Sequence, residues 1–221
     1  MNPINLSLLQ LDNLKKSFGE TLVVNGSFSL EAGEHVALTG SSGSGKSTLL
    51  HLISGLLRPD SGVIIFNGTD LTKLKEQNLD AFRARHLGYV FQTFHLLEGL
   101  TALENVETAI TFAGGRDYGK ARQVLIEMGL EERLEFFPSQ LSVGQCQRIA
   151  VARALVNQPL LVLADEPTAN LDEPRSEAVV QLLRDSCRKS GAALLLVSHD
   201  QRTVEAFDRV VDFQSQFGGA S

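Results

Sequence analysis

The chain has 221 residues, 43% of them hydrophobic, and a formal net charge of −6 at pH 7, which fits one large domain or one domain with an inserted lobe. The acidic balance argues against a general nucleic-acid binder. No apolar run reaches the roughly 18 residues of a membrane-spanning helix, and the first residues lack an export-signal pattern, so we expect a cytosolic protein unless a partner holds it elsewhere.

Residues 6–39 alternate polar and apolar side chains in the manner of antiparallel strands. Short runs of turn-forming residues interrupt the alternation. We expect an antiparallel lobe that leads into a buried strand at Glu34–Thr39. The expected strands are Leu6–Leu11, Thr21–Val24 and Ser27–Leu30, and the expected turns are Lys16–Glu20 and Glu31–Glu34.

Residues 40–48 fit the phosphate-binding pattern G-x-x-x-x-G-K-[ST], with a strand before them and a predicted helix over Ser47–Leu57 after them. Glycines let the backbone N–H groups of such a loop converge on a polyphosphate. Lys46 supplies a positive charge for the phosphates, and the Ser47 hydroxyl is suited to ligate Mg²⁺. We therefore expect a nucleoside triphosphate to bind to Gly40, Ser41, Ser42, Gly43, Ser44, Gly45, Lys46, Ser47 and Thr48.

The next segment continues the α/β pattern. A strand over Val63–Gly68 ends in an Asn-Gly hairpin signal, and a helix is expected over Glu76–Arg85. Leu87–Phe91 is a predicted buried strand with Gln92 at its carboxyl end. Because open α/β sheets place functional groups at strand ends, Gln92 is a candidate ligand of Mg²⁺ or water, although a lone glutamine is more often a solvated loop residue.

Helical periodicity replaces this pattern over residues 93–156, which we interpret as a helical subdomain inserted between core residues 1–92 and 157–221. Thr101 with Glu104, and Ser142 with Gln145, have the spacing of capping boxes. A helix over Tyr118–Met128 should end at Gly129. Packing within the lobe and docking of a partner both explain its apolar loop residues Phe94, Leu96, Leu97, Leu100, Phe136 and Phe137.

Two further buried strands are predicted near the end of the chain. Leu160–Glu166 ends in two acids, of which Asp165 can reach Mg²⁺ and Glu166 can accept a proton from an attacking water. A loop over Asn170–Asp172 precedes a helix whose first turn contains Pro174. His199 follows the strand Ala192–Val197 and can hydrogen-bond a γ-phosphate, and residues 207–213 complete the sheet.

These motifs, in this order, resemble the ATP-binding subunit of ABC transporters, over about Leu6–Phe213. The resemblance implies a P-loop NTPase fold with a mixed core sheet, an antiparallel lobe and a helical subdomain. It makes residues 40–48 the Walker A loop and Leu141–Gln145 the signature, with Ser142, Gly144 and Gln145 contacting nucleotide. It assigns the remaining roles to Phe18 (stacking on adenine), Gln92 (Q-loop), Asp165 (Walker B), Glu166 (general base), Asp172 (D-loop) and His199 (switch histidine).

The resemblance also implies partners. The signature of one subunit faces the Walker A loop of another, so that two copies form a head-to-tail dimer around ATP and Mg²⁺ and separate after hydrolysis. Closure and separation of the two copies would drive a separate membrane permease, which places the subunit at the inner face of the cell membrane. The segments His86–Gln92, Phe94–Val106 and Pro138–Leu141 resemble the group that serves lipoprotein release and macrolide export.

One residue departs from the family pattern, because Val143 stands where the signature normally has glycine. The neighbouring Cys146 either has a lowered pKa at the helix end or is an inert thiol; neither it nor Cys187 belongs to a metal or disulfide pattern. Two other functions stay open at this point. They are a non-transport ATPase that transmits a mechanical signal or assembles a soluble complex, and a nucleotide-gated binding module with weak hydrolysis.

Overall fold

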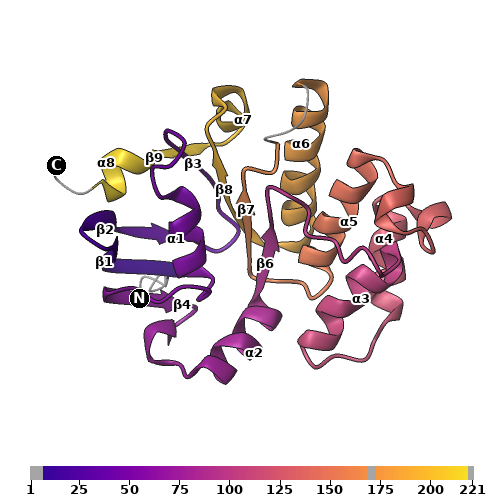
Figure 1. Ribbon diagram of the computed structural model, residues 1–221, viewed down its shortest axis with the longest axis horizontal. Helices are drawn as coiled ribbons and strands as arrows, with labels where there is room; N and C mark the ends of the chain where they lie inside the picture. Colours follow the sequence, from indigo (N-terminus) through magenta and orange to yellow (C-terminus); the bar gives the residue numbers. More distant parts are fainter. Residues whose placement is uncertain (1–6, 169–172, 219–221) are drawn as a thin grey trace, which may run out of the picture.

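The computed structural model describes residues 7–168 and 173–218, within which the strands form two sheets (Figure 1). Sheet A is antiparallel with the order β2-β1-β4-β5, and sheet B is parallel with the order β6-β7-β8-β3-β9. The strands of sheet A are β1 (Leu9–Phe18), β2 (Thr21–Leu30), β4 (Ser61–Phe66) and β5 (Thr69–Asp70). Those of sheet B are β3 (His35–Thr39), β6 (Leu87–Val90), β7 (Leu161–Asp165), β8 (Ala193–Ser198) and β9 (Arg209–Asp212).

The α-helices cover sheet B and build a lobe beside it (Figure 1). None of those in the described residues is both long and apolar enough to cross a bilayer. The α-helices are α1 (Lys46–Ile53), α2 (Glu76–His86), α3 (Ala102–Phe112), α4 (Gly119–Glu127), α5 (Val143–Leu155), α6 (Glu173–Ser190), α7 (Gln201–Glu205) and α8 (Phe213–Phe217). Short 3₁₀ helices occur at Leu71–Lys73, Glu131–Arg133 and Pro138–Gln140.

The antiparallel lobe differs from the prediction in the length of its first strands. The predicted turn at Lys16–Glu20 is shorter, because residues 16–18 stay paired with β2 and only Gly19 and Glu20 form the turn. Residues 21–30 form one strand in place of two, since Asn25 and Gly26 remain paired with β1. An irregularity in the pairing between Leu11 and Leu14 accommodates Asn13, whose φ is 47°.

Sheet B is buried on both faces, as its continuous apolar runs predict. One face of the sheet, with Leu163 and Leu195, packs against α1 and sheet A in a single hydrophobic cluster. The other face, with Val162 and Leu194, packs against α5 and α6 in a second cluster. The helices α1 and α5 therefore lie on opposite faces of the sheet.

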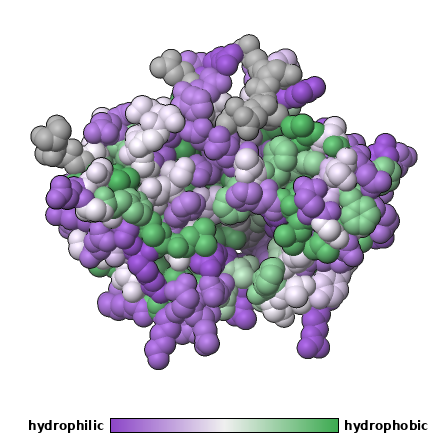
Figure 2. Space-filling view, in the orientation of Figure 1, coloured by the Kyte–Doolittle hydropathy of each residue, from purple (hydrophilic) through white to green (hydrophobic). Residues whose placement is uncertain are grey.

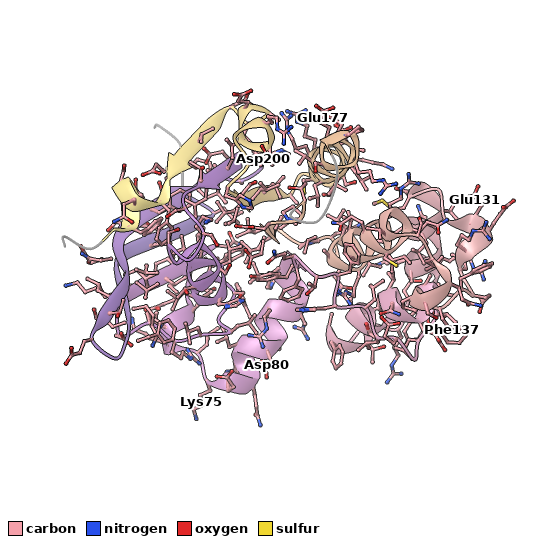
Figure 3. The ribbon with its side chains drawn as sticks, turned by 45° about the horizontal axis from the view of Figure 1, so that its top comes forward. Lys75, Asp80, Glu131, Phe137, Glu177 and Asp200 are labelled. Carbon is pink, nitrogen blue, oxygen red and sulfur yellow. The ribbon has the colours of Figure 1, made fainter. Side chains whose placement is uncertain are left out.

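A third hydrophobic cluster joins α3, α4 and α5. It forms the core of the helical lobe, which carries Glu131 and Phe137 at the opposite end of the molecule from sheet A (Figure 3). Helix α5 contributes to this cluster through Ile149 and to the sheet cluster through Val151. Helix α5 thus links the lobe to the sheet, and the subdomain limits at 93 and 156 stay a prediction.

Candidate functional site

The predicted site residues follow four neighbouring strands of sheet B. Gln92, Glu166, His199 and the loop at residues 40–45 come after β6, β7, β8 and β3, which are adjacent in that order. Carboxyl ends of parallel strands meet at one edge of a sheet, where α/β proteins bind ligands. At this edge the structure brings together Lys46, Ser47, Asp165, Glu166 and His199.

The loop between β3 and α1 is built around glycines with left-handed backbone conformations. Gly45, with φ 111°, is the N-cap of α1 and offers no side chain to the first N–H groups of the helix, which remain available to an anion. A Cβ at Gly45 would stand 2.6 Å from Cγ1 of Val23, whereas one at Gly43 would meet nothing within 4 Å. The Ser44 hydroxyl oxygen is buried without a hydrogen-bond partner among the described residues. The cradle therefore fits a phosphate group.

Lys46 is buried within this loop. Its Nζ donates hydrogen bonds to the carbonyl oxygens of Gly40 at 2.9 Å and Ser41 at 2.7 Å. The same nitrogen lies 3.8 Å from Oε1 of Glu166, whose other oxygen is 2.9 Å from Nδ1 of His199. Glu166 thus links the lysine of the loop to the histidine that follows β8.

Ser47 and Asp165 form the second contact of the site. The Ser47 hydroxyl donates to Oδ1 of Asp165 at 2.9 Å, which joins the start of α1 to the end of β7. The Tyr89 hydroxyl lies 3.5 Å from the other carboxylate oxygen. Burial raises the pKa of Asp165 above its usual range, against the opposing effect of the Ser47 hydrogen bond. A hydroxyl and a carboxylate in contact are hard oxygen donors of the kind that Mg²⁺ prefers.

The segment 141–145 lies apart from this edge, at the start of α5. Ser142 accepts a hydrogen bond from the N–H of Gln145, whose side chain accepts one from the N–H of Ser142, so the predicted capping box is confirmed. Ser142, Val143 and Gly144 are exposed. Among the described residues, no hydrogen bond or ion pair joins this helix end to residues 40–48.

Comparison with known proteins identifies the family in which this phosphate-binding loop and these strand-end residues occur. The sequence model of the ABC transporter family matches residues 23–169. The chain belongs to the ABC transporter family. It is 43% identical, over 92% of its length and 93% of the relative's, to the lipoprotein-releasing system ATP-binding protein LolD of Idiomarina loihiensis.

Two solved structures of an ABC transporter cassette, MJ0796, have the same fold. One is a dimer in a post-hydrolysis state with ADP and Pi, at TM-score 0.82 and 35% identity over 93% of this chain and 94% of that one. The other is a dimer of the same cassette, at TM-score 0.82 and 34% identity over the same shares. They confirm the predicted α/β P-loop fold, and with the family match they make this chain an ATP-hydrolysing ABC subunit.

Among the described residues of this ABC subunit, the predicted site residues Phe18 and Gln92 make no hydrogen bond or ion pair with the central cluster. Phe18 ends β1, its side chain is 52% exposed, and Nζ of Lys16 lies 5.6 Å from the centre of its ring. Gln92 is exposed beyond β6. Asp172 lies outside the described residues, as does the predicted loop that contains it. The individual roles of these residues therefore stay predictions.

Burial raises the pKa of the Cys146 thiol, which is 8% exposed. The alternative in which the helix end lowers that pKa is wrong, and Cys146 is the inert thiol. Burial also raises the pKa of Cys187, to about 12. Neither thiol is thus set up to act as a nucleophile.

Sequence reasoning missed Tyr89 and Arg153. Tyr89 was expected only as part of a buried strand, and its contact with Asp165 depends on β6 lying beside β7. Arg153, on α5, donates to the carbonyl oxygens of Phe94 at 2.7 Å and His95 at 2.6 Å. Nothing local in the sequence signals either contact, because both join segments more than 50 residues apart.

Proposed function

We propose that this chain is the ATP-hydrolysing subunit of a lipoprotein-release type of ABC system, closing with a second copy around Mg²⁺ and ATP to drive a separate membrane permease. The observation that carries this is the contact of Lys46 and Glu166, and of Ser47 and Asp165, at one sheet edge. Similarity to LolD over nearly the whole chain supports the choice of system.

In this proposal the phosphates lie on the loop at residues 40–45, where Lys46 exchanges its bonds to the loop carbonyls for phosphate oxygens. Ser47, Asp165 and Gln92 would hold Mg²⁺, which when bound would neutralise charge that develops on the phosphates. Within the described residues no three or more His, Cys, Asp or Glu side chains cluster to hold a metal. Mg²⁺ takes few protein ligands and fills the rest of its shell with water and phosphate oxygens.

Glu166 is the proposed base. Its carboxylate accepts the proton of the attacking water as the water oxygen bonds to the γ-phosphorus and the bridging oxygen of ADP departs. Two groups orient that carboxylate: Nδ1 of His199 at 2.9 Å and Nζ of Lys46 at 3.8 Å. Phe18 is proposed to stack on the adenine ring, for which its exposure leaves room.

The second copy supplies the other half of each site. Because α1 and α5 lie on opposite faces of sheet B, we assign Ser142, Gly144 and Gln145 to the nucleotide held by the partner copy. Their exposed helix end carries no acidic residue in its first turn, which favours an anion there. Asp172 is proposed to act at the same junction, as the D-loop of the family.

The permease is proposed to dock on a groove between α2, β6, α3 and α5, at the inner face of the cell membrane. The groove has a volume of about 350 Å³ and is lined by Tyr89, His95, Leu97, Phe112 and Arg153, among others. Figure 2 shows the surface hollowed in this region, with apolar side chains on its border. Exposed apolar side chains around a hollow mark a protein-binding surface.

The decisive variant is Glu166→Gln, which keeps the shape of the side chain but removes the base. We expect ATP turnover to fall at least about 100-fold, within the range for loss of general-base catalysis. ATP binding should survive, so the variant should elute as a dimer with ATP and Mg²⁺ and as a monomer without nucleotide. ATPase assays and size-exclusion chromatography measure both effects.

The matched control is Glu132→Gln, an exposed glutamate of the helical lobe. It should hydrolyse ATP and elute like the wild type. Undiminished turnover of Glu166→Gln would contradict the proposed base. Co-purification with a soluble complex in place of a membrane protein would favour the non-transport ATPase.

A further inference from the structure

Tyr89 lies between the proposed magnesium ligand and the groove. Strand β6 runs beside β7 with Tyr89 opposite Leu163, so Tyr89 and Asp165, two residues further along β7, point to the same face of the sheet. Its hydroxyl is 3.5 Å from Oδ2 of Asp165, and Ser47 donates to Oδ1 at 2.9 Å. The two oxygens of this carboxylate are thus contacted by side chains from different elements.

The ring of Tyr89 belongs to a column of aromatic side chains. It stacks on Phe91 with the ring centres 4.1 Å apart and the planes 20° from parallel. Phe91 in turn contacts the ring of His95, at 4.7 Å between centres, and His51 of α1 lies 6.1 Å from Tyr89 on the inner side. Rings at these distances pack against one another, so the displacement of one ring affects the position of its neighbour.

The outer end of the column reaches the groove and is held by α5. His95 and Tyr89 both line the groove. The backbone at Phe94 and His95 is fixed by two hydrogen bonds from the guanidinium of Arg153. A protein segment that enters the groove therefore contacts both His95 and Tyr89, and Tyr89 in turn contacts the carboxylate of Asp165.

We propose that Tyr89 is a positioning residue that orients the Asp165 carboxylate for hydrolysis and makes this orientation depend on occupation of the groove. This rests on the proposed function. A donor–acceptor distance of 3.5 Å is at the long limit of a hydrogen bond, so an inward movement of a few tenths of an ångström strengthens the contact. Docking in the groove supplies that movement through His95 and Phe91.

The hydroxyl of Tyr89 has no other hydrogen-bond partner among the described residues. Phenylalanine would fill the same space and stack equally well on Phe91, so packing alone does not require the oxygen. A half-buried tyrosine hydroxyl is costly without a partner.

The test compares Tyr89→Phe with Tyr118→Phe, since these are the two tyrosines of the chain. Tyr118 is 42% exposed on the helical lobe, and its hydroxyl contacts Thr111. We expect Tyr89→Phe to lower kcat about three- to tenfold, the worth of one hydrogen bond, with the KM for ATP within about twofold because the phosphate loop is unchanged. Stimulation of turnover by the co-purified permease should fall by a similar factor.

Tyr118→Phe should match the wild type in kcat, KM and stimulation. Equal kcat and equal stimulation in the two variants would overturn the role of Tyr89. Absence of turnover in the wild type and in both variants would instead contradict the proposed function, so the two failures are distinguishable.

Tyrosine fluorescence tests the role of Tyr89 even if Tyr89→Phe folds poorly. The chain has no tryptophan, so in Tyr118→Phe the tyrosine fluorescence comes from Tyr89 alone. We expect its emission to change when ATP and Mg²⁺ are added to the purified chain. Emission that does not respond to ATP and Mg²⁺ would overturn the proposal.

Discussion

Glu166 has a left-handed backbone conformation with φ 44°, which is uncommon for a residue other than glycine. Its N–H donates to the carbonyl oxygen of Val197 at 3.0 Å, and its side chain contacts Lys46 and His199. The end of β7 thus turns sharply and aims the carboxylate along the sheet edge. Strained backbone held in this way is typical of functional residues.

Val143 is the residue at which this chain departs from the family signature. It is the first residue of α5, and its side chain is 47% exposed beside Ser142 and Gly144. In the proposed dimer two methyl groups there obstruct the approach of the partner's phosphate. We expect Val143→Gly to raise kcat/KM for ATP about fivefold, corresponding to relief of about 1 kcal/mol of crowding.

Steady-state ATPase assays check this prediction, and thermal unfolding of the variant records any cost to α5. In kcat/KM, Val143→Ala should lie between valine and glycine, because alanine removes the two methyl groups but keeps Cβ, while its helix propensity is higher than that of glycine. A lower kcat/KM for both variants would mean that the valine side chain contributes to the active dimer.

At the scale of the element, helices α3 and α5 begin in the same way. Thr101 accepts a hydrogen bond from the N–H of Glu104, whose carboxylate accepts one from the N–H of Thr101, and Ser142 and Gln145 repeat the arrangement. One box stabilises the lobe, while the other lies at the proposed nucleotide contact. The box of α3 therefore allows capping to be tested separately from activity.

We expect Thr101→Ala to destabilise the protein by about 1 kcal/mol, because the N–H of Glu104 loses its partner at a helix start. For a chain of this size that lowers Tm by about 2–4 °C, which calorimetry can measure. Thr111→Ala is the matched control, since the exposed Thr111 near the end of α3 donates back to Glu107 and contacts the Tyr118 hydroxyl but caps no helix start. An equal Tm loss in both variants would contradict the assigned role of the cap.

Local signals account for the parts of the fold that the sequence predicts well. The hairpin between β4 and β5 forms at Asn67 and Gly68, both with positive φ, as their side chains favour. The β1–β2 ribbon was predicted too short, because polar residues at 16–18 look like a turn while their pairing with β2 is not visible in the sequence. Helix α8 was missed for a similar reason, since only packing buries Phe213 and Phe217.

In the candidate site, too, the residues with a local signal could be predicted and the contacts between distant segments could not. Gln92, Glu166 and His199 could be named because each follows an apolar run, and parallel strands end at a common edge. The contact of Ser47 with Asp165 spans 118 residues, and the contact of Tyr89 with Asp165 spans 76. Such contacts depend on the strand order β6-β7-β8-β3, which a linear sequence does not display.

For the whole molecule, the essential feature is that α5 belongs to two cores. It packs on sheet B through Val151 and on the lobe through Ile149, and it starts at the proposed contact with the partner copy. Arg153 on the same helix holds the backbone at the edge of the groove. A movement of the lobe relative to the sheet would thus displace the signature at the start of α5 and the edge of the groove together.

The groove itself is tested through Phe112, whose side chain is 77% exposed at the end of α3. If a permease segment covers this ring, Phe112→Ser loses a burial worth about 1.5–3 kcal/mol, and affinity falls at least about tenfold. We expect the folded variant to lose the permease on purification in detergent. Ile126→Ser is the control, because Ile126 on α4 is 48% exposed and does not line the groove. Equal retention of the permease by both variants would show that docking takes place on another surface.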